Sequence, residues 1–206
     1  VDIHDEYRPT GFSRTYPNLM TQEGIRGNEE MPDATHNTIL PFTRFLAGAA
    51  DYTLCYFNGR VKNTKAHQLA MAAVYYSPLQ FMFWYDRPEF YKGEEELEFW
   101  KAIPSVWDDS RALDGEIGEY IIQARRSGND WFVGAMTNTE ARTVTVMTDF
   151  LEPGKKYTAH LYEDDDKLNT GTKVRTAHKK VKAGDKLLHF ISVQACFFFQ
   201  FPNCCF

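Results

Sequence analysis

Apolar residues at helical spacing mark one segment in the first half of the chain. Its apolar face consists of Leu69, Ala70, Ala73 and Val74. Thr64 precedes this face and belongs to the residue types that cap helix N-termini, whereas Pro78 follows it and stops a helix. The pattern therefore predicts a helix between these two residues.

Three further segments of the first half have simpler patterns. Residues 1–4 (VDIH) are typical of a short strand whose end carries polar groups. Residues 79–85 (LQFMFWY) are almost wholly apolar, which predicts a strand that is buried on both faces. Residues 93–103 (GEEELEFWKAI) predict a second helix. The acidic residues expected on a solvated face near its N-terminus are Glu94, Glu95, Glu96 and Glu98.

The pattern changes from residue 106 onward, where short β-rich runs alternate with turn residues. The runs are EYIIQARRSG, NDWFVGAMTN, RTVTVMTDFL, KKYTAHLYEDD and TKVRTAHKKV. In the third run Val144 and Val146 alternate with threonines, as expected for a strand with one buried face. Runs of this kind predict antiparallel strands in a sandwich. We therefore expect an α/β domain over residues 1–103, followed by an all-β domain over residues 104–206.

Composition excludes several classes of function. The formal net charge of −5 and the lack of a basic stripe argue against a nucleic-acid partner. No apolar run reaches the roughly 18–20 residues of a membrane span. The four cysteines show neither CxxC spacing nor a companion histidine cluster, so they support neither a zinc site nor a disulfide framework. Since the chain starts with VDIHDEYRP, we expect it to be an internal piece of a longer protein.

Charged side chains are concentrated between residues 4 and 44. They are His4, Asp5, Glu6, Arg8, Arg14, Glu23, Arg26, Glu29, Glu30 and Arg44. A strand end followed by a long loop is how α/β barrels present catalytic groups. Three interpretations remain open: a solvated loop, a hard cation such as Ca²⁺ held by carboxylates, or a carboxylate pair that hydrolyses a glycoside. Periodicity does not decide between them.

Long motifs add a resemblance to a known family. They are HDEYRPTGFSRTYPNLMTQEGIRGNEE, TILPFTRFLAGAADYT, QLAMAAVYYSPLQ and IPSVWDDSRALDGEIGEYIIQARRSGNDWFVGAMTN. In this order they resemble glycoside hydrolase family 97, the α-glucosidases and α-galactosidases of Bacteroides-like bacteria. The family has an N-terminal β-super-sandwich, a catalytic (β/α)8 TIM barrel and a C-terminal β-domain. The resemblance implies that this chain holds the last strands and helices of the barrel, then the C-terminal antiparallel β-sandwich, in a periplasmic or secreted enzyme.

The resemblance also implies roles for individual residues. Glu29 matches the general acid, or acid/base, of the family, and Glu23 matches a calcium-ligating glutamate. Glu29 is expected to lie against the same Ca²⁺, which helps to orient the substrate. His4 stands where the family has a histidine that contacts substrate at a strand end, although a purely structural hydrogen-bonding role stays open. The implied activity is hydrolysis of terminal α-linked glucose or galactose from oligosaccharides.

Asp5 is the position where the sequence departs from the inverting branch of the family. Inverting members have a glutamate here as catalytic base, and aspartate is one methylene shorter. An inverting base must stand roughly 6.5–9.5 Å from the acid to admit a water molecule. The departure favours the retaining branch, whose nucleophile comes from a barrel strand upstream of Val1. If the branch is inverting, Asp5 is the candidate base.

Several expectations concern the surroundings of this site. Arg14, Arg26 and Arg44 are expected to pair with the acidic loop and to position it. The Phe/Cys-rich end, HFISVQACFFFQFPNCCF, is interpreted as a divergent last strand or as an altered end. The rival hypothesis is a non-catalytic β-sandwich for carbohydrate binding or oligomerisation, and a homo-oligomer through the C-terminal domain fits either view. The chain alone is expected to be inactive, because one catalytic carboxylate lies elsewhere.

Overall fold

The computed structural model describes residues 1–5, 8–191 and 194–200. Its first part contains short helices and two very short strands: β1 (Asp2–Ile3), α1 (Phe12–Thr15), β2 (Thr21–Gln22), α2 (Ala34–Ile39), α3 (Lys65–Val74) and α4 (Leu97–Ala102). Four 3-10 helices join them: η1 (Asn28–Glu30), η2 (Leu40–Phe42), η3 (Arg44–Leu46) and η4 (Pro88–Phe90). Among the residues described, no helix has the length and apolar character needed to cross a membrane.

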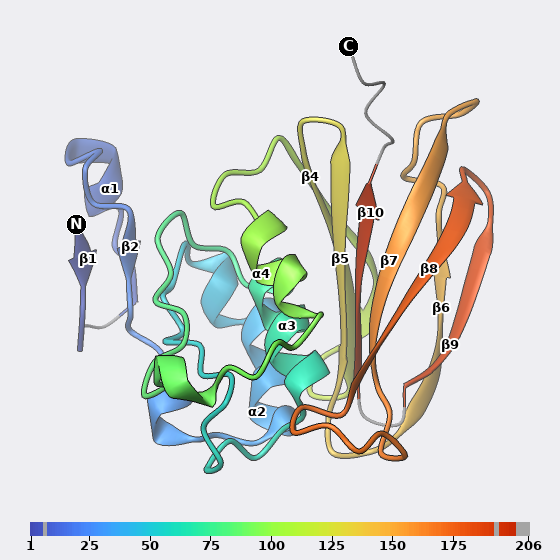
Figure 1. Ribbon diagram of the computed structural model, residues 1–206. Coiled ribbons are helices and arrows are strands. Elements are labelled where there is room, and N and C mark those ends of the chain that lie inside the picture. Colours follow the sequence, from blue (N-terminus) through green and yellow to red (C-terminus); the bar gives the residue numbers. More distant parts are fainter. Residues whose placement is uncertain (6–7, 192–193, 201–206) are drawn as a thin grey trace.

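The second part consists of β-strands in two sheets. The strands are β3 (Asp109–Glu116), β4 (Tyr120–Ser127), β5 (Asp130–Thr137), β6 (Arg142–Met147), β7 (Lys156–Asp164), β8 (Val174–Lys182), β9 (Lys186–Ile191) and β10 (Gln194–Gln200). The larger sheet has the order β3-β4-β5-β10-β7-β8 with antiparallel pairs throughout, and β6 pairs with β9 separately. Figure 1 shows α2, α3 and α4 on one face of the larger sheet and the β6–β9 pair on the other.

The five predicted runs are confirmed as β4, β5, β6, β7 and β8. Val144 and Val146 are buried, and the threonines between and beside them are exposed, as the alternation predicted. β3 was not predicted because it is an edge strand with mostly exposed residues and a register shift between Ala112 and Asp114. Its sequence therefore has no clear two-residue period.

The Phe/Cys-rich end supplies a central strand of the larger sheet. β10 pairs with β5 on one side and with β7 on the other. Both faces of this sheet are covered, one by helices and the other by the β6–β9 pair. A strand in such a place takes a continuous apolar run instead of an alternating one. The Phe/Cys-rich run thus forms a strand over residues 194–200, whereas residues 201–206 lie outside the described residues.

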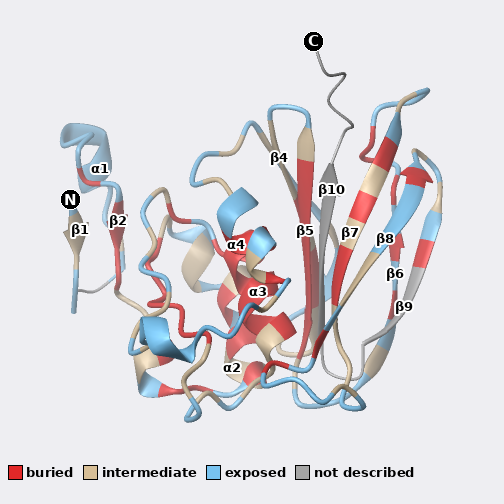
Figure 2. Cartoon of the chain, in the orientation of Figure 1, coloured by how far each residue is buried: buried red, intermediate tan, exposed pale blue. Residues whose placement is uncertain are grey.

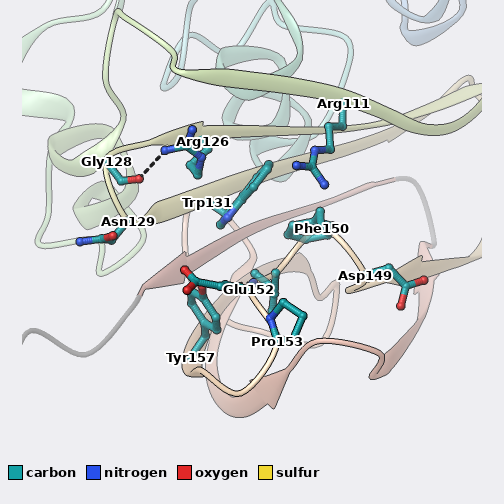
Figure 3. A pocket seen from close by; sticks show the side chains of 11 residues that line it. Arg111, Arg126, Gly128, Asn129, Trp131, Asp149, Phe150, Glu152, Pro153 and Tyr157 are labelled. Carbon is teal, nitrogen blue, oxygen red and sulfur yellow. Dashed lines mark hydrogen bonds between the residues drawn. The ribbon is translucent and has the colours of Figure 1, made fainter.

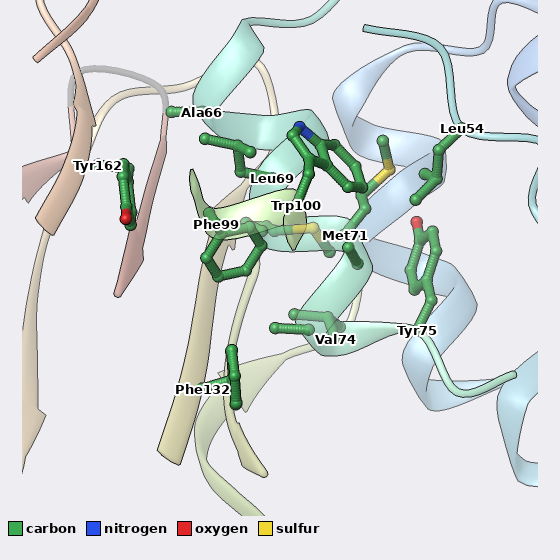
Figure 4. Close-up of a cluster of buried hydrophobic side chains, with 14 of the residues drawn as sticks. Leu54, Ala66, Leu69, Met71, Val74, Tyr75, Phe99, Trp100, Phe132 and Tyr162 are labelled. Atoms are coloured by element: carbon green, nitrogen blue, oxygen red, sulfur yellow. The ribbon is translucent and has the colours of Figure 1, made fainter. Parts of the chain in front are cut away.

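Helix α3 is the centre of the helical layer and is confirmed as predicted. The side chain of Thr64 caps it by accepting a hydrogen bond from the backbone N–H of His67. All its residues but the first are buried, and its side chains join those of α4, β5 and β7 in one core (Figures 2 and 4). Arg125 of β4 donates hydrogen bonds to the carbonyls of Ala73 and Val74 at 2.8 and 2.9 Å, which satisfies the C-terminal end of the helix. Helix and sheet are therefore packed as one unit.

The prediction of a strand over residues 79–85 is wrong. Only Met82 forms a bridge there, to Leu54, and several apolar side chains of the run are exposed. Phe83 and Tyr85 have φ angles of 61° and 63°, in the left-handed region that interrupts an extended strand. An apolar run forms a strand buried on both faces only where neighbouring segments pair with it along its length. Among the described residues, this run has only a single bridge.

The prediction that the acidic residues of the second helix form a solvated face is also partly wrong. The helix begins at Leu97, later than expected, and Glu96 is only 3% exposed. Its carboxylate accepts a hydrogen bond from the hydroxyl of Tyr56 at 2.9 Å. A buried partner of this kind offsets the loss of water around a carboxylate. Composition alone does not reveal such a partner, which lies 40 residues away in the chain.

Candidate active site

Two short parallel strands bring the polar ends of distant segments together. β1 pairs with β2 so that Ile3 lies opposite Gln22. Because the strands are parallel, His4 and Asp5 leave the pair at the same end as Glu23. The backbone N–H of Glu23 also donates to the carbonyl of Ile3 at 2.8 Å, which continues the pairing to this point.

Glu23 is the buried centre of the site, with only 4% of its surface exposed. Its Oε2 is hydrogen-bonded to Nδ1 of His4. The same oxygen accepts a hydrogen bond from the backbone N–H of Asp5 at 2.5 Å. Asp5 has a φ of 57°, in the left-handed region that turns this N–H toward the glutamate. His4 also meets the edge of the Trp84 ring, with centroids 6.1 Å apart.

Glu29 is held in place by contacts of the short helix η1 with the core. The backbone N–H of Asn28 donates to the carbonyl of Tyr52 at 2.9 Å, and its side-chain amide donates to Gln68 of α3 at 3.0 Å. A glycine is needed at position 27, directly before η1, because a Cβ there would lie 2.8 Å from Oγ1 of Thr53. The glycine of the motif thus allows η1 to approach the core closely, and Glu29 takes its position from α3.

The four candidate residues form one cluster. His4, Asp5, Glu23 and Glu29 each offer a ligand atom, and these atoms all lie within 4.8 Å of one another. Burial raises the pKa of Glu29, and the hydrogen bond and negative charge of Glu23 raise it further. A carboxyl group with a raised pKa keeps its proton to a higher pH, as a general acid requires.

The donor set of this cluster fits a hard cation. Asp5, Glu23 and Glu29 supply carboxylate oxygens, the ligands that Ca²⁺ takes. The carboxyl groups of Glu23 and Glu29 are in contact, which raises the pKa of Glu29 unless a positive charge lies between them. The imidazole of His4 is a less usual ligand for Ca²⁺, and it is hydrogen-bonded to Glu23.

Arg44 positions the loop, but not through the carboxylates as expected. Its guanidinium donates hydrogen bonds to backbone carbonyls on both sides of the site, namely those of Gln22, Glu23, Gly24, Gly48 and Ala49. Arg14 and Arg26 form no ion pair with any described residue. The expected pairing of these two arginines with the described carboxylates of the acidic loop is therefore wrong. Carbonyl oxygens are strong acceptors that no sequence pattern marks, so this role was not predictable.

Asp51 is a residue of the surroundings that sequence reasoning missed. It is buried, and its Oδ1 accepts hydrogen bonds from the backbone N–H groups of Thr53 and Phe81 at 3.2 and 3.0 Å. Burial raises its pKa to about 6, and the charges of Asp2 and Glu23 contribute. A single aspartate in an apolar stretch carries no sequence signal of this kind.

A cavity of about 370 Å³ in the β-rich part lies apart from this cluster (Figure 3). Trp131 and Tyr157 line it, but each is only 3% exposed. The guanidinium groups of Arg111 and Arg126 lie over the Trp131 ring, 5.2 and 6.0 Å from its centroid. The aromatic faces are thus covered, and they do not form the open platform on which a sugar ring stacks.

Comparison with known proteins identifies the class of the chain. Residues 106–197 match the family model described as "Glycosyl-hydrolase 97 C-terminal, oligomerisation". A retaining alpha-galactosidase of Bacteroides thetaiotaomicron is 36% identical over 185 residues, which cover 80% of this chain and 28% of that protein. A probable retaining alpha-galactosidase of Streptomyces bingchenggensis is 34% identical, over 71% of this chain and 24% of that protein.

The structural comparison agrees. A glycoside hydrolase family 97 enzyme from Pseudoalteromonas sp. strain K8, solved in complex with acarbose, has a TM-score of 0.85 and 36% identity. The match covers 97% of this chain and 34% of that one, so the chain spans about a quarter to a third of its relatives' length. The chain belongs to glycoside hydrolase family 97 and corresponds to a C-terminal part of such enzymes.

Proposed function

We propose that this chain supplies one half of the active site of a retaining α-glycosidase, with Glu29 as general acid. The observation that carries the proposal is the cluster of His4, Asp5, Glu23 and Glu29 at the end of the β1–β2 pair. Family membership supports the reaction class, glycoside hydrolysis. In this proposal the short parallel elements of the first part are the last strands and helices of a TM barrel, and the nucleophile comes from the rest of that barrel.

Glu29 and His4 have different tasks in the proposed mechanism. Glu29 donates a proton to the glycosidic oxygen, and burial, the largest cause of its raised pKa, favours the protonated form that this step needs. The carboxylate of Glu23 accepts from Nδ1 of His4, and in the neutral form of the ring Nε2 is then the acceptor. Nε2 then accepts a hydrogen bond from a sugar hydroxyl and orients the ring of the substrate.

The spacing of the carboxyl groups supports the retaining branch. Ligand atoms of Asp5 and Glu29 lie within 4.8 Å of each other. An acid and base pair of an inverting enzyme stands roughly 6.5–9.5 Å apart, with a water molecule between. This distance argues against Asp5 as an inverting base opposite Glu29. We assign Asp5 to cation binding and to the backbone hydrogen bond that positions Glu23.

The proposal includes a calcium ion held by Glu23, Glu29 and Asp5, which the donor set supports. When bound, the cation supplies positive charge beside the carboxylates and helps to orient substrate hydroxyl groups. Terminal α-linked galactose is the favoured substrate, since two relatives are described as retaining alpha-galactosidases, and α-linked glucose is the alternative. A periplasmic or secreted location remains part of this proposal, on family grounds alone.

The role of Glu29 is tested with a chimera. This chain replaces the matching segment of the Bacteroides thetaiotaomicron relative, and hydrolysis is measured for two α-galactosides. With a sugar as leaving group, Glu29→Gln is expected to lower turnover by about 10³-fold, because the departing oxygen needs a proton. With a dinitrophenolate leaving group, which departs without a proton, the loss should be far smaller.

Glu30→Gln is the matched control, since Glu30 is an exposed neighbour on the same helix η1. It should leave both activities near those of the unsubstituted chimera. Equal losses for both leaving groups in Glu29→Gln, or equal effects of the two substitutions, would overturn the assignment of Glu29. The chain by itself should hydrolyse neither substrate.

The calcium proposal is tested by calorimetric titration of the chain with CaCl₂. Glu23→Gln removes the buried carboxylate at the centre of the cluster and should abolish measurable binding. Glu30→Gln should retain it. Unchanged affinity in Glu23→Gln would remove the calcium claim and leave the assignment of Glu29 standing, because the two tests use different readouts.

A second function rests on residues 106–197, whose family model is described by oligomerisation. We propose that the β-rich part joins copies of the protein while the first part carries the chemistry. Sedimentation of the chain at several concentrations measures the assembly directly. A monomer throughout the range would contradict this part of the proposal.

A further inference from the structure

A row of aromatic side chains leads away from His4 toward the surface. The centroid of the Trp84 ring lies 6.1 Å from that of the His4 imidazole, and the Tyr85 ring lies 6.0 Å further along, centroid to centroid. The guanidinium carbon of Arg60 lies 4.8 Å from the centroid of the Tyr85 ring. Trp84 is half-buried, whereas Tyr85 and Arg60 are exposed. The row therefore begins at the candidate active site and ends in solvent.

The backbone around Trp84 has a conformation that bulky residues rarely adopt. Phe83 and Tyr85, on either side of it, have φ angles of 61° and 63° in the left-handed region. In an extended strand, successive side chains point to opposite faces, whereas here the rings of Trp84 and Tyr85 lie beside each other. The backbone N–H of Trp84 donates to the carbonyl of Leu54 at 2.9 Å, which fixes this arrangement. Strained backbone of this kind is concentrated at ligand-binding and catalytic sites.

The Tyr85 ring is open to solvent, in contrast to the aromatic rings of the cavity in the β-rich part. Trp131 of that cavity is 3% exposed and lies under two guanidinium groups. Among the described residues, Tyr85 meets a single guanidinium, that of Arg60, and 51% of its surface is exposed. A flat ring with an open surface can pack against the apolar face of a sugar. Arg60 has N–H donors beside it for the hydroxyl groups of that sugar.

The place of this row relative to Glu29 determines which part of a substrate meets it. His4 and Glu29 offer ligand atoms within 4.8 Å of each other, so the inner end of the row lies beside the proposed general acid. A general acid protonates the oxygen of the leaving group, so the leaving-group sugar lies on the side of the acid. Because the row leads outward from this point, it follows the path of that sugar and not of the terminal unit that is removed.

We propose that Trp84 and Tyr85 form the binding surface for the leaving-group sugar, which makes oligosaccharides the preferred substrates of the site. This inference rests on the proposed function of the His4 cluster. The leaving-group sugar packs its apolar face on the two rings, and Arg60 donates hydrogen bonds to its hydroxyl groups. The binding energy of this sugar then holds the glycosidic oxygen beside Glu29.

The test compares two substrates of the chimera that carries this chain in the Bacteroides thetaiotaomicron relative. Both have a terminal α-linked galactose, but the leaving group of raffinose is a disaccharide and that of α-galactosyl fluoride is fluoride, which cannot stack on a ring. Tyr85→Ala should raise the KM for raffinose about tenfold and leave kcat/KM for the fluoride within about twofold. Trp84→Leu also removes the contact with His4, so it should impair both substrates, with the larger loss for raffinose.

Two further variants are the controls. Tyr85→Phe keeps the ring and should keep the KM for raffinose, whereas Tyr91→Ala removes a tyrosine that is also 51% exposed but lies outside the row, and it should affect neither substrate. An unchanged KM for raffinose in Tyr85→Ala, an equal effect of Tyr85→Ala on both substrates, or an equal rise in Tyr91→Ala would overturn this inference and leave the proposed function standing. A folded, unsubstituted chimera that does not hydrolyse the fluoride would overturn both.

Discussion

The two parts of the molecule hold their side chains in place by different means. In the part before residue 104, helices are short and the β1–β2 strands have two residues each, so loops carry the candidate active site. The β-rich part is held by long antiparallel ladders. The described non-glycine residues with positive φ, which mark turns of the loops, are Asp5, Met31, Thr53, Phe83, Tyr85 and Lys173. All but Lys173 lie in the first part.

This difference shows how irregular backbone is kept in one conformation. A ladder satisfies backbone groups by register, whereas a loop needs side chains to do so. Arg44 and Asp51 take this role in the first part, one as a donor to carbonyls and the other as an acceptor for N–H groups. Polar side chains in the first part therefore have structural roles as well as chemical ones, and substitutions can separate these two kinds of role.

The largest effect is expected for Arg44→Ala. It removes charged hydrogen bonds to carbonyls on both sides of the site, and it should lower the free energy of unfolding by about 4 kcal/mol. Arg14→Ala is the control, an exposed arginine on α1 that should change stability by less than about 0.5 kcal/mol. Urea unfolding measures both. Similar losses in the two variants would show that the loops do not depend on Arg44.

Asp51→Asn should change how stability depends on pH. Because the pKa of Asp51 in the folded chain is raised from 3.8 to about 6, the folded chain holds this proton more tightly than the unfolded chain. The contribution of Asp51 therefore falls by about 3 kcal/mol in all as the pH rises from below about 4 to above about 6. The asparagine of the variant keeps an oxygen that accepts both N–H bonds, but its amide does not ionise.

The measurement is the urea midpoint of both proteins across this pH range in metal-free buffer. The variant should gain stability relative to the original chain as the pH rises, and the difference should level off above about pH 6. A constant difference between the two proteins would mean that Asp51 ionises normally in the fold.

Gly134→Ala tests the contact between the helical layer and the sheet. A Cβ at this position in β5 would lie 2.5 Å from the carbonyl oxygen of Ala70 in α3 and 2.7 Å from a methyl group of Val74. Separating the two layers should lower stability by about 2 kcal/mol. Gly171→Ala, where a Cβ meets open space, should be nearly neutral. A neutral Gly134→Ala would indicate that α3 can shift over the sheet.

The sequence by itself determined the elements whose signals are local. Helix α3 has its cap and its apolar face within about a dozen residues, and β4 to β8 have runs bounded by turn residues. The four candidate site residues were also predicted from the sequence. His4 and Asp5 were predicted from a family resemblance and from their place at a strand end, because no spacing connects them to Glu23. Local periodicity and capping depend on residues that are neighbours along the chain, so the amino-acid sequence shows them directly.

Only the tertiary structure decided which distant residues meet. Parallel pairing of β1 with β2 brings His4 to Glu23, and contacts with α3 bring Glu29 to both. The same kind of long-range register sets His160 against His178. Glu96 is buried against Tyr56, 40 residues away, and the raised pKa of Asp51 comes from burial and from the charges of the distant residues Asp2 and Glu23. Pairing, burial and charge coupling arise between segments that the fold brings together, and no local pattern encodes them.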